Sequence, residues 1–171
     1  MDDDAPTAAC RVEMARRDLR RILAALRPLD AALARIPDDR LAEQPVPEQY
    51  PAGLMIAHAY HVVAMCALAV RLGRLTERDA AGLGTPEERY MEREGIASFG
   101  MRAREESEAL LDELEPARVD GKVEFHFGMS ATGLETVAIA YGELLHHRGQ
   151  LQSFLRLMGI EPPDVYARGE G

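Results

Sequence analysis

The chain has 171 residues, with 20 lysines and arginines against 29 aspartates and glutamates, so its formal net charge at pH 7 is −9. An acidic excess of this size repels a phosphate backbone, which disfavours nucleic-acid binding. Hydrophobic residues make up 47% and charged residues 29%, as in ordinary globular proteins, so disorder of the bulk is excluded. Since a domain has roughly 150 residues, we expect residues 1–171 to form a single domain.

Cysteine content and the N-terminal residues indicate a cytoplasmic protein. Cys10 and Cys66 are too few for a disulfide scaffold and lack the spacing of a zinc or redox motif. The first residues, Met1 to Asp4, are acidic and are not followed by the apolar core of a signal peptide. The longest apolar run, 62–70, is about half of the ~20 residues that a membrane-spanning helix needs. We therefore expect a reducing compartment and no membrane span.

Four long helices are predicted along the chain. Apolar residues recur at helical spacing in the ranges 7–36, 51–72, 96–114 and 132–158. The second of these is apolar on nearly all sides, so it should be the most buried. Long helices in this number favour an all-α fold, a four-helix bundle.

The connections between these helices differ in composition. Residues 38–50 form a proline-containing linker, while 76–95 are charged and interrupted by glycine and proline, which predicts short helical pieces in a long crossover. Apolar and polar residues alternate over 119–127 after an Asp-Gly turn, which predicts a short extended or hairpin segment before the last helix. The last residues, 168–171, have the composition of a loose tail.

The five histidines are the main chemical clue. They fall in three places: His58 and His61 on the second helix, His126 in the extended segment, and His146 with His147 on the last helix. His58 and His61 are three residues apart, so they project from one helix face, and their apolar neighbours predict that this face points toward the core.

A carboxylate accompanies the histidines of the last helix. Glu143 is four residues before His147, and its apolar neighbours predict that it is buried, which is costly unless it is paired or coordinated. If the second and last helices are neighbours, His58 or His61 could join Glu143 and His147 as three ligands. Such a set suits zinc, nickel or iron(II) and leaves positions for water or substrate. The open alternative is that these histidines are structural and hydrogen-bonded to other protein groups.

Residues Glu143 to His146 also spell E-x-x-H, the motif that di-iron carboxylate bundles use twice. No second E-x-x-H occurs in the sequence. A ferritin-like di-iron centre is therefore disfavoured.

The last predicted helix resembles that of a known family. Residues 145–151, LHHRGQL, and the residues that follow up to the Pro162-Pro163 pair are similar to the last helix of the DinB/YfiT-like proteins. Residues 51–58, PAGLMIAH, and the preceding loop, 41–50, are similar to that family's segment around its first metal ligand. The layout agrees over nearly the whole chain, and the last helix carries the most specific part of the resemblance.

The resemblance implies a four-helix bundle, usually dimeric, with a divalent metal held by three histidines. His58 and His147 match two of the family's ligand positions, and the third falls at Glu143. The site is then either two histidines and one carboxylate or has lost its metal. His61 and His146 are further candidates for the third ligand. The implied metal is nickel or zinc, with iron as a further candidate.

Family members with known activity resemble thiol-dependent transferases and isomerases, in which a low-molecular-weight thiol such as bacillithiol or mycothiol is activated on the metal. The resemblance therefore implies a homodimeric S-transferase or isomerase that acts on a small molecule. Two alternatives stay open: a noncatalytic, stress-associated dimeric bundle or binding protein that has lost its metal through Glu143, and a metal-dependent hydrolase that needs no thiol. The sequence assigns no catalytic residue.

Overall fold

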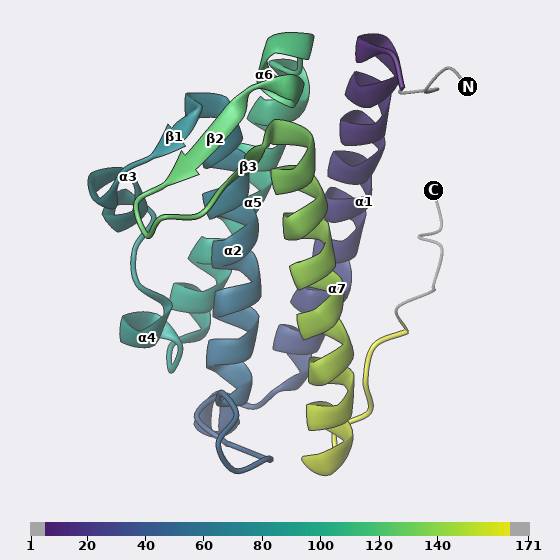
Figure 1. Ribbon diagram of the computed structural model, residues 1–171. Helices are drawn as coiled ribbons and strands as arrows, with labels where there is room; N and C mark the ends of the chain where they lie inside the picture. Colours follow the sequence, from purple (N-terminus) through teal and green to yellow (C-terminus); the bar gives the residue numbers. More distant parts are fainter. Residues whose placement is uncertain (1–5, 165–171) are drawn as a thin grey trace.

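The computed structural model describes residues 6–164, which form a bundle of four long helices with a small sheet beside one end (Figure 1). The predicted mostly helical bundle is confirmed, and each long helix begins and ends within three residues of its predicted bounds. The long helices are α1 (Ala8–Arg35), α2 (Ala52–Leu72), α5 (Arg93–Asp112) and α7 (Gly133–Leu157).

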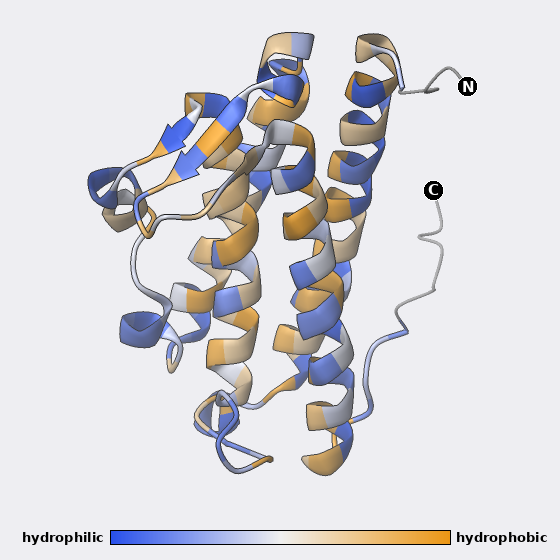
Figure 2. Cartoon of the chain, viewed as in Figure 1, coloured by the Kyte–Doolittle hydropathy of each residue, from blue (hydrophilic) through white to orange (hydrophobic). Residues whose placement is uncertain are grey.

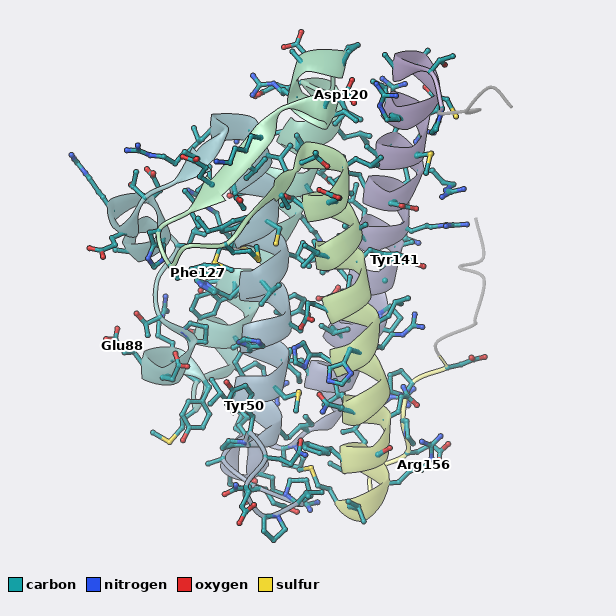
Figure 3. The ribbon with its side chains drawn as sticks, in the orientation of Figure 1. Tyr50, Glu88, Asp120, Phe127, Tyr141 and Arg156 are labelled. Carbon is teal, nitrogen blue, oxygen red and sulfur yellow. The ribbon has the colours of Figure 1, made fainter. Side chains whose placement is uncertain are left out.

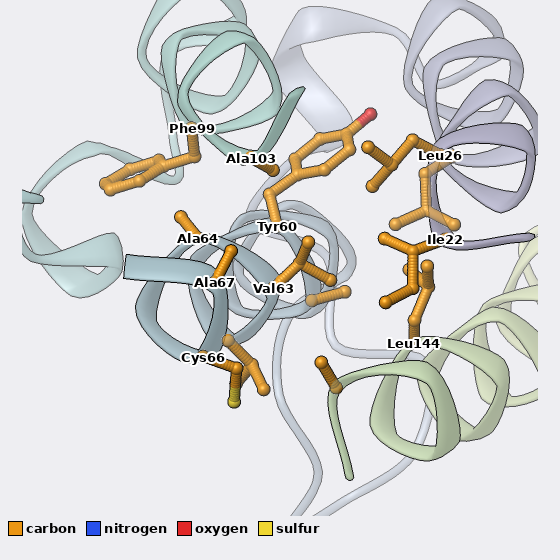
Figure 4. Close-up of a cluster of buried hydrophobic side chains, with 14 of the residues drawn as sticks. Ile22, Leu26, Tyr60, Val63, Ala64, Cys66, Ala67, Phe99, Ala103 and Leu144 are labelled. Atoms are coloured by element: carbon orange, nitrogen blue, oxygen red, sulfur yellow. The ribbon is translucent and has the colours of Figure 1, made fainter. Parts of the chain in front are cut away.

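Helix α2 lies at the centre of the bundle, where it packs most extensively against α5 and α7. Apolar residues cover it on nearly all sides, whereas α1 carries hydrophilic residues along its outer side (Figure 2). Its side chains interlock with those of the neighbouring helices, as around Val63 and Ala67 (Figure 4). Helix α2 has more buried residues than any of the other three long helices, which confirms the prediction that it is the most buried of the four.

By length and composition alone, α2 could cross a membrane, and it is the one helix in the described part of the chain that meets this criterion. The central helix of a globular protein meets the same criterion. Here 78% of the most apolar window of α2 is buried inside the bundle.

The crossover between α2 and α5 contains the short helical pieces that the sequence predicts. These are α3 (Glu77–Gly82) and α4 (Pro86–Arg89), and they follow a two-residue strand, β1 (Arg74–Leu75). Strand β1 pairs in parallel with β2 (Lys122–Phe125), and β2 pairs antiparallel with β3 (Ser130–Thr132). The hairpin was expected and the third strand was not, because two residues are too few to show a periodicity.

Two other details differ from the sequence expectations. Helix α5 ends at Asp112 rather than at residue 114, and Pro116 begins a separate short helix, α6 (Pro116–Asp120), where the missing N–H of proline costs nothing. The extended segment therefore starts after Asp120 rather than at Val119. The linker after α1 contains a short 3₁₀ turn, η1 (Asp38–Arg40). The proposed tail, 168–171, lies outside the described residues.

A buried polar contact fixes the rotation of α2 in the bundle. Tyr60 is fully buried and donates a hydrogen bond of 2.6 Å to Oδ1 of Asp30 on α1, while Arg104 on α5 donates to Oδ2 of the same carboxylate. In the core view, the ring of Tyr60 extends from α2 between α5 and α1 (Figure 4). Since residues two apart on a helix are rotated by about 200°, His58 faces away from this contact.

The start of α7 is fixed by a capping box and by close backbone packing. The hydroxyl of Thr132 accepts from the backbone N–H of Glu135, whose carboxylate in turn accepts from the N–H of Thr132. The next residue, Gly133, packs so tightly on α6 that a Cβ there would collide with the carbonyl oxygen of Arg118. These contacts set the position of the helix that carries Glu143 and His147.

We predict opposite effects of alanine at two glycines of α7. Gly133→Ala should lower the free energy of unfolding by about 1–3 kcal/mol because the methyl group has no room. Gly142→Ala should raise it by up to about 1 kcal/mol, since nothing lies within 4 Å of the new Cβ and alanine favours the helix. Urea denaturation of the two variants measures both changes, and equal effects would contradict this account of how α7 is anchored.

Candidate metal site between α2 and α7

The site begins with two histidines that face each other across the contact between α2 and α7. The ring centroids of His58 and His147 are 4.9 Å apart, and the ring planes are nearly perpendicular, at 89°. His147 is 8% exposed and His58 is partly buried. The structure thus brings together two of the residues that the sequence analysis singled out as metal ligands.

Glu143 lies one turn before His147 on α7. Its Oε2 is 3.4 Å from Nε2 of His147, but the two atoms do not form a hydrogen bond. The expectation that this carboxylate is buried is wrong, because the side chain of Glu143 keeps 48% of its exposure. The half-exposed side chain remains in contact with water, so the cost expected for a buried carboxylate does not arise.

The other ring nitrogen of His147 has a partner that fixes the protonation of the imidazole. Nδ1 lies 3.0 Å from Oε1 of Gln150, and Nε2 of Gln150 in turn donates to Oε1 of Gln49 at 3.5 Å. With its amide N–H groups turned toward Gln49, Gln150 presents an acceptor to His147, and this arrangement favours the tautomer with the proton on Nδ1. In that tautomer the lone pair of Nε2 points into the site.

This arrangement fits a cation. The buried Nε2 of His147 and the carboxylate oxygen of Glu143 lie close together without a hydrogen bond between them. Two electron-rich atoms in this position repel each other, and a positive ion between them would remove the repulsion. Within residues 6–164, no three histidine, cysteine or carboxylate side chains are gathered closely enough to hold a metal as they stand. The donor chemistry of His58, Glu143 and His147 fits a metal, and metal binding by them stays a prediction.

Burial determines how the imidazoles titrate. It lowers the pKa of His58, and a charged His147 nearby would lower it further. Burial likewise lowers the pKa of His147, against the hydrogen bond to Gln150, which raises it. Both rings are therefore neutral at neutral pH, which is the form that binds a metal.

The other three histidines lie at different distances from this pair. His146 is exposed, with its ring 5.2 Å from that of His147. His61 is one turn after His58 on α2, packs edge-on against Phe99 of α5, and has a buried Nδ1 without a hydrogen-bond partner among the described residues. His126 is exposed, directly after β2, and its ring contacts that of Phe127.

A cavity of about 280 Å³ adjoins the site. His58 and His61 line it from α2, and residues of α3, α4 and the loop between them form the opposite wall. Tyr50, in the loop before α2, closes another side of His58 with a ring-to-ring distance of 5.4 Å (Figure 3). His58 thus contacts His147 and also lines a cavity that is large enough for a small molecule.

Sequence reasoning missed several residues around the site. No role in the site was predicted for Gln150, although its spacing three residues after His147 is the signal for a side-chain contact on one helix face. Gln49 and Tyr50 are in a loop, where no periodicity indicates which side chains turn inward.

Comparison with known proteins agrees with this layout. The family model described as DinB superfamily matches residues 11–151, which include α2 and the part of α7 that carries Glu143 and His147. The chain belongs to the DinB superfamily. The crystal structure of the DinB-like protein YjoA from Bacillus subtilis matches this DinB-superfamily chain with a TM-score of 0.67 and 19% sequence identity, over 87% of this chain and 96% of that one. No curated protein matches the chain.

We predict that Gln150 controls the tautomer of His147. In metal-free protein, ¹⁵N spectra of the imidazoles should show the proton of His147 on Nδ1, and Gln150→Met should move a substantial share of it to Nε2 because the acceptor is gone. Gln152→Met is the matched control, since the side chain of Gln152 bonds to the carbonyl of Pro163 instead. An unchanged His147 signal in Gln150→Met would contradict the proposed hydrogen bond.

Proposed function

We propose that this chain is a divalent-metal-dependent enzyme that holds the ion with His58, Glu143 and His147. The observation that carries the proposal is the buried Nε2 of His147, which has no hydrogen-bond partner within residues 6–164 and lies 3.4 Å from a carboxylate oxygen of Glu143. The perpendicular approach of the His58 ring and membership of the DinB superfamily support it. Nickel or zinc suits two imidazoles and one carboxylate best, and iron(II) is compatible with them.

When bound, a divalent cation would lower the pKa of a thiol or of water and so supply a nucleophile at neutral pH. Three protein ligands leave room for such a group. Gln150 holds the imidazole of His147 in the tautomer that presents Nε2, and His58 connects the ligand set to the cavity from which a small molecule would approach.

The nucleophile that we propose is a thiol brought by a second ligand. Cys66, on α2, is near enough to Glu143 for that charge to affect it, but it is buried, and burial raises the pKa of its thiol to about 12. At neutral pH this thiol stays protonated and inert. An external low-molecular-weight thiol, of the bacillithiol or mycothiol type, would therefore be needed for S-transfer or isomerisation.

The proposal extends to the setting of the reaction. The acidic net charge of −9 disfavours nucleic acid as a partner, and the burial of α2 removes the most apolar helix from contact with a membrane. We infer a cytoplasmic homodimer that acts on a small molecule.

Elemental analysis of tag-free protein, expressed with nickel, zinc and iron available, tests the ligand set. We expect near-stoichiometric metal in the wild type. His58→Ala, Glu143→Ala and His147→Ala should each reduce metal affinity on the order of 100-fold, because each removes one of three ligands. Glu143→His, which supplies the histidine found at this position in the family, should keep or increase the metal content.

The matched control is His126→Ala, which removes an exposed histidine that belongs to neither α2 nor α7 and should leave metal content unchanged. Circular dichroism of each variant separates loss of a ligand from loss of fold. A folded wild type without metal under all three supplies would overturn the proposal and favour the noncatalytic bundle.

Thiol dependence is tested with cobalt(II) in place of the native metal. Adding a thiol should produce a thiolate-to-cobalt charge-transfer absorption in the wild type, and it should not in His147→Ala. If instead the loaded protein cleaves esters or amides without thiol, and thiols leave the cobalt spectrum unchanged, the chain is a hydrolase rather than a thiol-dependent transferase.

A further inference from the structure

The cavity beside His58 has walls that differ in chemistry. His58 and His61 line one side, and the opposite wall, from α3 and the loop that follows it, presents small side chains such as Ala80 and Ala81 together with Thr85 and Glu87. Its volume of about 280 Å³ is at the small end for a ligand site. It holds a small molecule or one end of a larger one.

Glu87 is the one acidic side chain among the described residues that line the cavity, and no lysine or arginine of this part of the chain lines it. Within the described part of the chain, the carboxylate of Glu87 has no hydrogen bond or ion pair. Glu87 is exposed and lies in the wall opposite His58 and His61.

A cavity with one unpaired carboxylate and no cation discriminates between ligands by charge. A negatively charged group would meet repulsion from Glu87, and a positively charged nitrogen would gain an ion pair that no protein group supplies. The alanine and glycine surfaces of the wall add no opposing charge. The buried Nδ1 of His61, which has no hydrogen-bond partner in the part of the chain that the structure describes, offers a second polar contact on the α2 side.

We propose that Glu87 selects small molecules that carry a cationic nitrogen, binding this group while the other end of the ligand reaches His58. The inference deepens the proposed function and rests on it for placing the reactive end at His58. The substrate class is then an amine-bearing thiol, or an amine-bearing acceptor for it, rather than a carboxylate.

Two small thiols of similar size and opposite charge test this selection: cysteamine, which carries an ammonium group, and 3-mercaptopropionate, which carries a carboxylate. Their dissociation constants are measured on the cobalt(II)-loaded protein from the charge-transfer absorption. Glu87→Gln should reduce the preference for cysteamine over 3-mercaptopropionate about three- to tenfold, as expected for one partly solvated charge. Because the preference is compared between proteins, the different thiol pKa values of the probes cancel.

The matched control is Glu88→Gln, which removes the same charge one residue later. Glu88 does not line the cavity and points outward from α4 (Figure 3). This variant should keep the wild-type preference. An equal loss in both variants would show that only the net charge matters and would overturn the assignment to Glu87.

A second measurement on metal-free protein keeps this inference separate from the metal proposal. The imidazole ¹H–¹⁵N signals of His58 and His61 are followed during titration with the same two probes. Shifts caused by cysteamine at lower concentration than by 3-mercaptopropionate, and lost in Glu87→Gln, support charge selection even if the protein binds no metal. Two outcomes overturn the proposed selection by Glu87. In the first, the protein binds metal but Glu87→Gln changes neither measurement; in the second, cysteamine produces no response in either measurement.

Discussion

A helix that is apolar on nearly every side cannot lie on the surface of a protein in water, and α2 imposes this constraint on the whole chain. Burying it requires neighbours all around, which α1, α5 and α7 provide. Its polar side chains must then find a place inside the bundle. Tyr60 donates a hydrogen bond to Asp30. The imidazole of His58 packs against His147 of α7, and that of His61 packs against Phe99 of α5. The polar interior of the molecule follows from the burial of this one helix.

The pair His58 and His147 shows how burial and chemistry are linked here. Neutral rings are stable inside the bundle because desolvation opposes their protonation, and the same neutral form has a lone pair to offer. Gln150 holds one nitrogen of His147, so the other is directed to Glu143. The side chain of Glu143 is about half exposed. The site thus combines buried imidazoles with a carboxylate in contact with water, a donor set that fits the metal ion that we propose.

The helices could be predicted because their signals are local. Thr7 and Thr132 cap helices, Gly73 ends one in the left-handed region, and apolar spacing shows which faces turn inward. The pairing of α2 with α7 was not a local signal and depended on the family resemblance. Strand β1 was missed because its pairing with β2 joins segments far apart in the sequence.

At the site, sequence reasoning found the residues and misjudged their surroundings. Apolar neighbours along the chain suggested that Glu143 is buried, but exposure is decided by what packs across from a residue, and at Glu143 one side is open. The same limit applies to Gln150 and Glu87. Gln150 contacts His147, and Glu87 lines the cavity. The apolar and polar pattern of the sequence does not show which residues of other segments, or which cavities, lie next to these side chains.

The cavity wall is formed by a segment that is anchored to the core at only a few residues. The stretch from β1 to α4 is attached at one end by the pairing of Leu75 with Phe125 and held in the middle by buried Leu83 and Pro86. The wall residues Ala80, Ala81 and Thr85 lie outside the buried core. Mutations at these positions are therefore free to accumulate without unfolding the protein, so that ligand preference can diverge among descendants while the helices that carry the histidines stay the same.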